Sequence, residues 1–277
     1  MIRKPLHLIK ILQNRGSHQN VSKSVKNFSK QSLYHKIYKK LQSGCKRQDF
    51  LAFCEEILEV NEKELILELL RGCGLWIVED SKNVSLDLSL HYQECEYCFV
   101  DIETTGSKPI ESSVIEIGAI KYFRGKIIDR FETLVYANKI PEEITQLTGI
   151  DTKMLQNSPS EKYALLELRK FLGNSVFVAH NVAFDYNFIS SRLEKYGDYG
   201  LLNPRICSVE LAQKSILSPR YSLSFLNEFL GVNAPASHRA YADAFVCMRV
   251  FEIALLNLPK EVYSLKDLIV FSRGKRL

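Results

Sequence analysis

The stretch that decides the fold runs from Tyr97 to Val135 and reads YCFVDIETTGSKPIESSVIEIGAIKYFRGKIIDRFETLV. It contains three apolar runs, which are Tyr97–Ile102, Val114–Phe123 and Lys126–Val135. Arg124-Gly125 separates the last two runs, and a short link containing Gly between apolar runs is typical of a β-hairpin. The stretch therefore predicts three consecutive strands that form an antiparallel meander.

Helices and strands alternate after this meander. The apolar runs predict strands at Ser175–Ala179 and Arg205–Ser208. Apolar residues at helical spacing predict helices at Pro141–Leu147, Glu161–Leu172, Val182–Tyr196, Leu223–Leu230, Ala240–Leu256 and Ser264–Phe271. An antiparallel meander followed by alternating helices and strands predicts an α/β domain, with a mixed β-sheet flanked by helices.

The charges are unevenly distributed along the chain, which has a formal net charge of +5. Residues 1–48 contain twelve Lys and Arg and no Asp or Glu, so the remaining residues carry −7. We expect this segment to be a mobile basic arm that contacts phosphates, although a transit peptide or a protein-docking arm would fit the same composition. Tyr34 and Tyr38 lie among its lysines, a pattern that suits either base stacking or ordinary helix packing.

A second segment, residues 49–95, separates the basic arm from the α/β domain. Asp49–Leu70 has the apolar spacing of a helix, and two short runs, Leu75–Val78 and Val84–Leu90, flank polar residues in the pattern of a hairpin. We interpret the segment as a small helix–hairpin module, either winged-helix-like or a cap on the next domain. The α/β domain is expected to span 96–258, followed over 259–277 by a C-terminal helix and a basic tail.

Composition excludes several classes of protein. The chain is 46% hydrophobic and 25% charged, values that are ordinary for a globular protein and exclude a fully disordered or collagen-like chain. No apolar stretch approaches the roughly 20 residues of a membrane span, so we do not expect an integral membrane protein. The seven scattered cysteines indicate reduced thiols in a cytoplasmic protein. Cys95 and Cys98 could join Cys73 and His91 in a zinc site, but buried thiols are the simpler interpretation.

Acidic residues stand at element ends in three separate segments. Asp101 and Glu103 are two residues apart at the end of the first strand, so they share one face. Asp185 falls in the first turn of a helix that follows a strand. Asp243 lies inside an apolar helix for which Ser237 is the expected N-cap, and an acid there is costly unless it is paired or binds a metal.

These four carboxylates and His238, which precedes Asp243 by five residues, suggest a metal-dependent reaction. Ligation by carboxylates alone is what hard cations such as Mg²⁺ and Mn²⁺ prefer. Four carboxylates suit a site with two divalent cations that act on a phosphodiester. A neutral histidine could accept the proton of the attacking water.

The three segments together resemble the DEDDh 3′→5′ exonucleases, and most closely the proofreading family that includes the epsilon subunit of bacterial DNA polymerase III. The family's first motif corresponds to Phe99–Gly106, the second to His180–Asp185 and the third to His238–Asp243. Further similarity lies in Val114–Ile120 and Leu147–Ile150. The resemblance spans about residues 97–258 and does not cover residues 1–95.

The resemblance implies a ribonuclease H-like fold and a set of site residues. Asp101, Glu103, Asp185 and Asp243 would hold two divalent cations, Mg²⁺ or Mn²⁺, and His238 would be the general base. The residues implied along the substrate cleft are Thr104, Thr105, His180, Asn181 and Phe184. The implied reaction is hydrolysis of the 3′-terminal phosphodiester of DNA, single-stranded or frayed, with release of nucleoside 5′-monophosphates.

The same resemblance implies a proofreading role, with a DNA polymerase catalytic subunit and a sliding clamp as partners and no membrane. Two alternatives remain open at this point. An RNA 3′-trimming enzyme would use the same fold and site. From a different class, the chain could be a nucleic-acid-binding or polymerase-tethering module, although its complete set of carboxylates argues against that.

Overall fold

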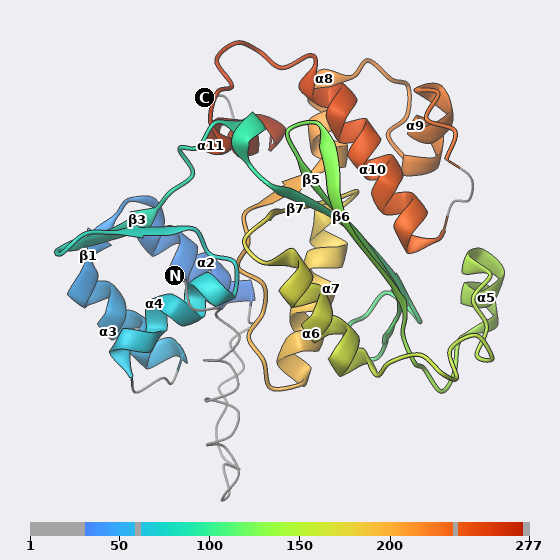
Figure 1. Cartoon of the computed structure of the whole chain (residues 1–277), viewed down its shortest axis with the longest axis horizontal. Helices are drawn as coiled ribbons and strands as arrows, with labels where there is room; N and C mark the ends of the chain where they lie inside the picture. Colours follow the sequence, from blue (N-terminus) through green and yellow to red (C-terminus); the bar gives the residue numbers. More distant parts are fainter. Residues whose placement is uncertain (1–30, 59–61, 235–237, 274–277) are drawn as a thin grey trace, which may run out of the picture. The chain divides into compact units, whose positions relative to one another are not determined.

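The computed structural model describes residues 31–58, 62–234 and 238–273. Contacts divide the chain into two compact units, residues 1–87 and 88–277 (Figure 1). Residues 1–30 of the expected basic arm lie outside the described residues. Residues 31–48, which composition groups with that arm, instead contribute a helix and a short strand to the first unit, because Ile37 and Leu41 are buried there.

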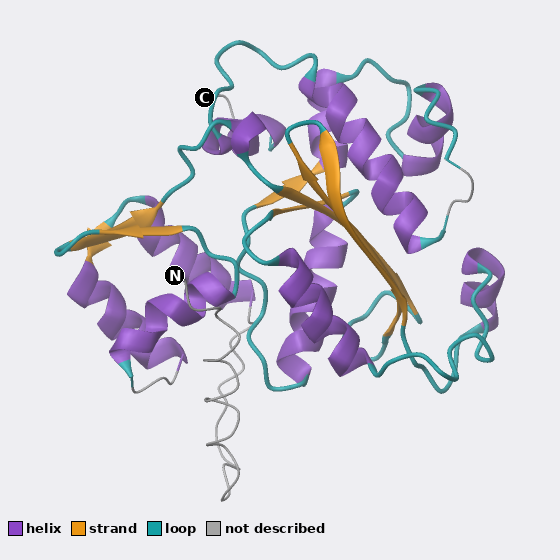
Figure 2. Ribbon diagram, in the orientation of Figure 1, coloured by secondary structure: helices purple, strands orange, loops and turns teal. Residues whose placement is uncertain are grey.

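The described part of the first unit consists of three helices and a small antiparallel sheet (Figure 2). Its elements are α2 (Gln31–Gln42), β1 (Cys45–Lys46), α3 (Arg47–Leu58), α4 (Lys63–Gly72), β2 (Ile77–Glu79) and β3 (Asn83–Leu86). The strand order is β1-β3-β2. The core is built from buried side chains of the helices, among them Ile37, Leu41, Phe50, Cys54, Ile66 and Leu70.

The single helix expected over Asp49–Leu70 is wrong, since α3 and α4 are separate helices. Glu62, at the N-cap of α4, has an extended backbone with φ −106° and ψ 95°. The break lets both apolar faces turn toward one core, which one straight helix could not do. The expected hairpin is present with shorter strands, and Asp80 Oδ1 accepts the N–H groups of Lys82 and Asn83 at 2.7 Å in its turn.

The second unit is built on a five-stranded mixed sheet with the order β6-β5-β4-β7-β8 (Figure 1). The strands are β4 (Tyr97–Thr104), β5 (Val114–Phe123), β6 (Lys126–Leu134), β7 (Val176–Ala179) and β8 (Arg205–Cys207). The helical segments are η1 (Tyr92–Glu94), α5 (Glu142–Thr148), α6 (Glu161–Leu172), α7 (Val182–Lys195), α8 (Ser208–Ser215), α9 (Leu223–Phe229), α10 (Ala240–Leu255) and α11 (Leu265–Ser272). Strands β4, β5 and β6 are antiparallel and β4, β7 and β8 are parallel, so the predicted meander and mixed sheet are confirmed.

The two faces of β4 have different partners. Cys98, Val100 and Ile102 belong to the core that packs under α6 and α7. Phe99 points the other way, where its ring lies 5.2 Å from that of Phe251 on α10. Since alternate residues of a strand point to opposite faces, Asp101 and Glu103 lie on the α10 side of the sheet.

Two features of the C-terminal half differ from expectation. Helix α8 was not predicted, because its eight residues follow β8 directly and are too few to show helical periodicity. Helix α11 belongs to the second unit, since the N–H of Lys266 donates to the carbonyl of Leu88 at 3.0 Å. Lys275 and Arg276 of the expected basic tail lie outside the described residues.

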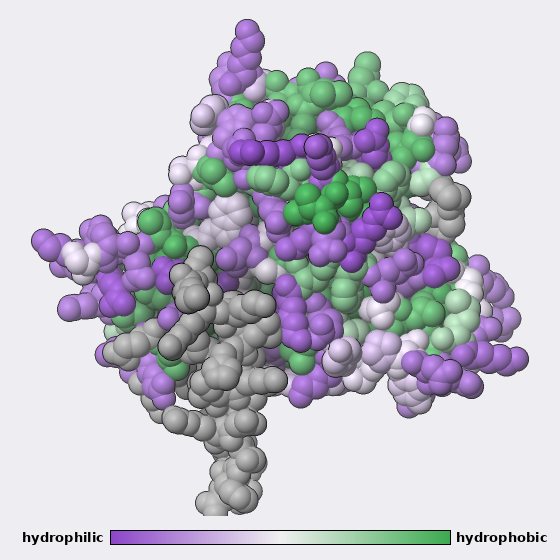
Figure 3. All heavy atoms as spheres, in the orientation of Figure 1, coloured by the Kyte–Doolittle hydropathy of each residue, from purple (hydrophilic) through white to green (hydrophobic). Residues whose placement is uncertain are grey.

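All seven cysteines are free thiols. Burial raises the pKa of the Cys54 and Cys95 thiols to about 12, so neither ionises at neutral pH. Within the described ranges, no group of residues suited to holding a metal includes a cysteine, so the zinc alternative has no support. Among the described helices, none has the length and apolar character that crossing a bilayer requires. Polar residues alternate with apolar areas on the face shown in Figure 3.

A buried ion pair joins α6 and α7 to the loop that follows β4. The Arg192 and Glu161 side chains are only 2% and 5% exposed, and Arg192 Nε donates to Glu161 Oε1 at 2.8 Å. Arg192 also donates to the carbonyl of Pro109 at 3.0 Å. Glu161 accepts the N–H of Val114 at 2.9 Å. The pair therefore fixes the segment between β4 and β5.

We expect Arg192→Ala to lower the free energy of unfolding by about 3–5 kcal/mol, because it leaves Glu161 buried without its cation. Arg249→Ala is the matched control, since Arg249 forms a half-exposed ion pair with Glu252 on α10, a type worth at most about 1 kcal/mol. Urea unfolding followed by circular dichroism measures both. Equal losses in the two variants would contradict the role of the buried pair.

Candidate active site

Two of the predicted site acids lie near the end of β4. Asp101 is paired in register with Gly118 of β5, and Glu103 with Glu116. The register shifts directly after Glu103, so the backbone changes direction there. The Thr104 hydroxyl donates to the carbonyl of Gly106 at 2.9 Å, which closes the turn that follows.

Asp185 comes to the same place from α7. Its side chain is 3% exposed, and its Oδ1 accepts the N–H of Ile102 at 3.3 Å. Ile102 lies between Asp101 and Glu103, so this hydrogen bond holds the first turn of α7 beside both acids. Asn181 precedes α7 with φ 75°, a left-handed conformation that Asn tolerates better than most residues.

Asp243 and His238 are contributed by the start of α10. The main-chain N–H of His238 donates to Asp243 Oδ2 at 2.9 Å, which ties the preceding segment to the helix. Glu103, His238 and Asp243 each offer one ligand atom, and these atoms all lie within 4.8 Å of one another. Ser237, the expected N-cap, lies outside the described residues, and the helix is capped from Arg239 without a side-chain hydrogen bond.

The acids of the site oppose one another's ionisation. Burial raises the pKa of Asp101 well above its ordinary value, and the charges of Asp185, Asp243 and Glu103 raise it further. Burial, with help from Asp243, raises the pKa of Glu103 to about 7. Burial also raises the pKa of Asp185. Carboxylates gathered in this way are stabilised in their charged form by a bound cation.

The other residues expected along the cleft have varied surroundings. Thr105 Oγ1 accepts the N–H of Ser113 at 2.9 Å, and the ring of Phe184 packs 5.7 Å from that of Phe188. Asn181 is exposed at the start of α7. Both ring nitrogens of His180 are engaged within the protein, at 2.8 Å from Ser208 Oγ and 2.8 Å from the carbonyl of Tyr221.

Sequence reasoning missed two charged residues beside the acids. Glu116 is 1% exposed near the start of β5, and its carboxylate forms an ion pair with Arg239. The signal was present, because an acid within the apolar run Val114–Phe123 needs a partner when the strand is buried. The partner could not be read from the sequence, since Arg239 stands more than a hundred residues later.

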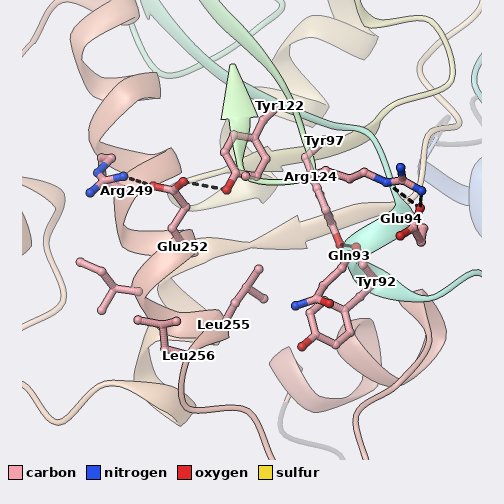
Figure 4. Close-up of a pocket in the computed structure, with 12 residues that line it drawn as sticks. Tyr92, Gln93, Glu94, Tyr97, Tyr122, Arg124, Arg249, Glu252, Leu255 and Leu256 are labelled. Atoms are coloured by element: carbon pink, nitrogen blue, oxygen red, sulfur yellow. Dashed lines mark hydrogen bonds and ion pairs between the residues drawn. The ribbon is translucent and has the colours of Figure 1, made fainter. Parts of the chain in front are cut away.

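A separate pocket lies at the opposite ends of β4 and α10 (Figure 4). Its volume is about 620 Å³, and Tyr97, Tyr122 and Leu255 are part of its lining. None of the predicted site residues lines it. The Tyr122 hydroxyl donates to Glu252 at 2.7 Å along one wall.

Comparison with known proteins identifies the family. An exonuclease family model, RNase_T, matches residues 98–251, which is more than half of the chain. The chain belongs to this exonuclease family. The matched region contains all three motifs, so it includes Asp101, Glu103, Asp185, His238 and Asp243.

Two bacterial DNA polymerase III proteins resemble the chain over different lengths. The DNA polymerase III subunit epsilon of Aquifex aeolicus is 34% identical over 157 residues, covering 56% of this chain and 78% of that protein. The PolC-type DNA polymerase III of Thermotoga petrophila is 33% identical over 224 residues. That match covers 77% of this chain but only 16% of the much longer polymerase.

Solved structures share the fold of this exonuclease family member. E. coli exonuclease I in complex with a dA16 oligonucleotide superposes with a TM-score of 0.52 at 16% identity. The match covers 60% of this chain and 42% of exonuclease I. The mixed sheet flanked by helices is therefore the ribonuclease H-like architecture that the motifs implied.

Proposed function

We propose that this chain is a divalent-cation-dependent 3′→5′ exonuclease that removes nucleoside 5′-monophosphates from DNA 3′ ends. The observation that carries the proposal is the convergence of Asp101, Glu103, Asp185 and Asp243 from three distant segments. A single strand end with two acids would be unremarkable. Four acids brought together beside an accessible histidine have no simple structural purpose.

The chemistry of these donors fits hard divalent cations. The four carboxylates offer only oxygen ligands, which Mg²⁺ and Mn²⁺ prefer. Burial raises the pKa of all four carboxyl groups, so a bound cation would favour their charged forms. Asp101, Glu103, Asp185 and Asp243 would hold two cations, which when bound neutralise charge on the reacting phosphate.

The chain's own residues supply the proton transfer and the positioning. His238 is exposed, and its main chain is held by Asp243, so its ring is available at the site while its backbone is fixed. We assign it as the general base that takes a proton from the attacking water. The water oxygen then bonds to phosphorus as the bond from phosphorus to the 3′ oxygen of the preceding nucleotide breaks, and that oxygen takes up a proton from solvent to become the new 3′ hydroxyl. Thr104, Thr105, His180, Asn181 and Phe184 are proposed to shape the cleft around the terminal nucleotide.

Proofreading for a replicative DNA polymerase is the role we propose. The similarity to the epsilon subunit and to PolC-type polymerases supports it. In this role the partners would be a polymerase catalytic subunit and a sliding clamp, and the location would be the cytoplasm. The runner-up is RNA 3′-trimming, which the same site chemistry supports equally.

The deciding experiment incubates the full chain with 3′-mismatched DNA, matched DNA and RNA of the same sequence. Each substrate is tested with Mn²⁺, with Mg²⁺ and with excess EDTA. We expect nucleoside 5′-monophosphates from DNA, faster at the mismatched end, and no product in EDTA. Preference for RNA would favour trimming, and binding without turnover would favour a tethering module.

The basic arm is expected to contribute affinity rather than chemistry. To test this, residues 1–30 are deleted. The deletion ends at Lys30 because α2 begins at Gln31 and belongs to the first unit. Residues 1–30 carry seven Lys and Arg. If about half of these cations contact phosphates, the deletion should make the slope of log K against log salt concentration less steep by roughly 2–3, where K is the association constant for single-stranded DNA. Titration at several salt concentrations checks this, and identical slopes would leave targeting or protein docking as the role.

A further inference from the structure

Glu116 is a buried acid whose hydrogen-bond partners lie at the start of α10. Its Oε1 accepts hydrogen bonds from Arg239 Nε at 3.0 Å and from Arg239 Nη2 at 2.6 Å. Its Oε2 accepts the N–H of Ala240 at 2.9 Å. A charged group that is 1% exposed needs such partners, because an unpaired buried charge is strongly destabilising.

These contacts fasten the first turn of α10 to β5. Ala240 is the first residue of the helix, where backbone N–H groups have no partner within the helix. Arg239, at the N-cap, makes no side-chain cap, so Glu116 on the neighbouring strand β5 supplies the acceptor that a local Ser or Asp usually supplies. Its negative charge also suits the positive end of the helix dipole.

Gly118 allows the backbone of α10 to lie directly against β5. It lies two residues after Glu116, on the same face of β5. A Cβ atom at Gly118 would come within 2.2 Å of the Tyr241 nitrogen, so the strand and the helix backbone are in direct contact there. Glu116 and Gly118 thus fix both the position and the separation of the helix start.

The segment held in this way carries two of the site residues. His238 precedes the anchored turn, and Asp243 lies within the first turn of the helix. His238 has φ 63°, a conformation that is uncommon for residues other than Gly and persists only where its surroundings hold it. Glu103 has a ligand atom within 4.8 Å of those of His238 and Asp243, and it is the register partner of Glu116 across β4 and β5.

We propose that Glu116 and Arg239 are a positioning pair that sets His238 and Asp243 relative to Glu103 for the nuclease reaction. The inference rests on the proposed function. Neither residue is assigned contact with the reacting atoms. The pair acts through the start of α10, and Arg239 also offsets the charge that Glu116 would otherwise add to the acidic site.

The test compares Glu116→Gln and Arg239→Lys with the wild type in three measurements. These are kcat and KM on a single-stranded oligonucleotide, Mn²⁺ binding to the metal-free protein by calorimetry, and the melting temperature without metal. We expect Glu116→Gln to lower kcat and Mn²⁺ affinity by about 10- to 100-fold, the usual cost of losing a group that orients metal ligands. KM should change little, because the pair is not expected to touch the substrate.

Arg239→Lys and the double variant Glu116→Gln with Arg239→Gln sharpen the result. Lysine keeps the charge but not the two-pronged donor of arginine, so we expect it to restore only part of the activity. The double variant should lose no more than Glu116→Gln alone, because the two residues act as one unit. Arg249→Gln, in an ion pair farther along the same helix, is the matched control and should behave as wild type.

Three outcomes would overturn the inference. One is a lower melting temperature for Glu116→Gln with wild-type kcat and Mn²⁺ affinity, which would make the pair purely structural. Another is full recovery with Arg239→Lys, which would leave only a charge effect. The third is a wild-type chain that binds no Mn²⁺. A wild-type chain that binds Mn²⁺ but cleaves no DNA or RNA would overturn the proposed function, while the calorimetry would still decide the positioning role.

Discussion

Asp101→Asn is expected to abolish nuclease activity while raising the melting temperature of the metal-free protein. The loss should be roughly 10³-fold or more, because bound cations supply several kcal/mol of transition-state stabilisation and each 1.4 kcal/mol is about tenfold. The gain in stability also comes from removal of the Asp101 charge. Burial and four neighbouring acids raise the pKa of Asp101, so its ionised form disfavours the folded state at neutral pH.

The sign of this effect makes it testable against pH. A neutral asparagine of the same shape removes the cost of the buried charge, and about 1 kcal/mol would appear as a rise of about 2–4 °C. The gain should shrink as the pH falls toward about 4, where the carboxyl becomes protonated in folded and unfolded chains alike. Added Mn²⁺ should stabilise the wild type more than the variant, because a cation stabilises the folded state according to its affinity for that state, and the variant lacks one carboxylate of the proposed cation site.

Melting curves with and without Mn²⁺, together with product release from labelled DNA, measure both halves of this prediction. Asp129→Asn controls for the chemical change at an exposed position. Wild-type turnover by Asp101→Asn would rule out its role in the cation site. A fall in the melting temperature of the metal-free variant would show that Asp101 serves the fold instead.

His238→Ala should lower single-turnover cleavage by about 10²–10⁴-fold, the usual contribution of a general base. Binding of DNA and of Mn²⁺ should stay at wild-type strength, because the base acts only when a proton moves. The hydrogen bond from residue 238 to Asp243 uses the main chain and survives the substitution. Added imidazole should restore part of the rate, since it supplies the missing proton acceptor.

The geometry also defines the competing account of His238. Its ligand atom lies within 4.8 Å of those of Glu103 and Asp243, close enough for all three to hold one cation. If His238 served as a ligand, its removal would weaken Mn²⁺ binding. Added imidazole would then not be enough to restore the rate. Calorimetry on the variant therefore separates a base from a ligand, and weakened Mn²⁺ binding would contradict our assignment.

The strands and most helices of the second unit could be read from the sequence because their apolar patterns are long and regular. Strands β4 and β5 of the meander have two apolar faces, and the structure buries both of them, whereas β6 is exposed or half-buried along its length. Shorter elements escaped prediction. Helix α8 has only eight residues, and the break between α3 and α4 depends on how two apolar faces meet in one core.

The sequence by itself determined which acids form the candidate site. Asp101, Glu103, Asp185 and Asp243 stand at strand and helix ends, where short-range patterns place them without knowledge of the fold. His238 follows from its fixed spacing to Asp243. Such assignments can be made from the sequence because each depends on a few neighbouring residues and on the chemistry that carboxylates share.

Only the tertiary structure decided what holds these residues in place. Glu116 finds Arg239 across 123 positions, and Gly118 matters only because the backbone of α10 lies against it. His180 likewise finds Ser208 and the carbonyl of Tyr221 only in the folded chain. Buried charges and close backbone contacts are satisfied by whatever the fold brings near, so their partners are set by three-dimensional packing and not by local sequence.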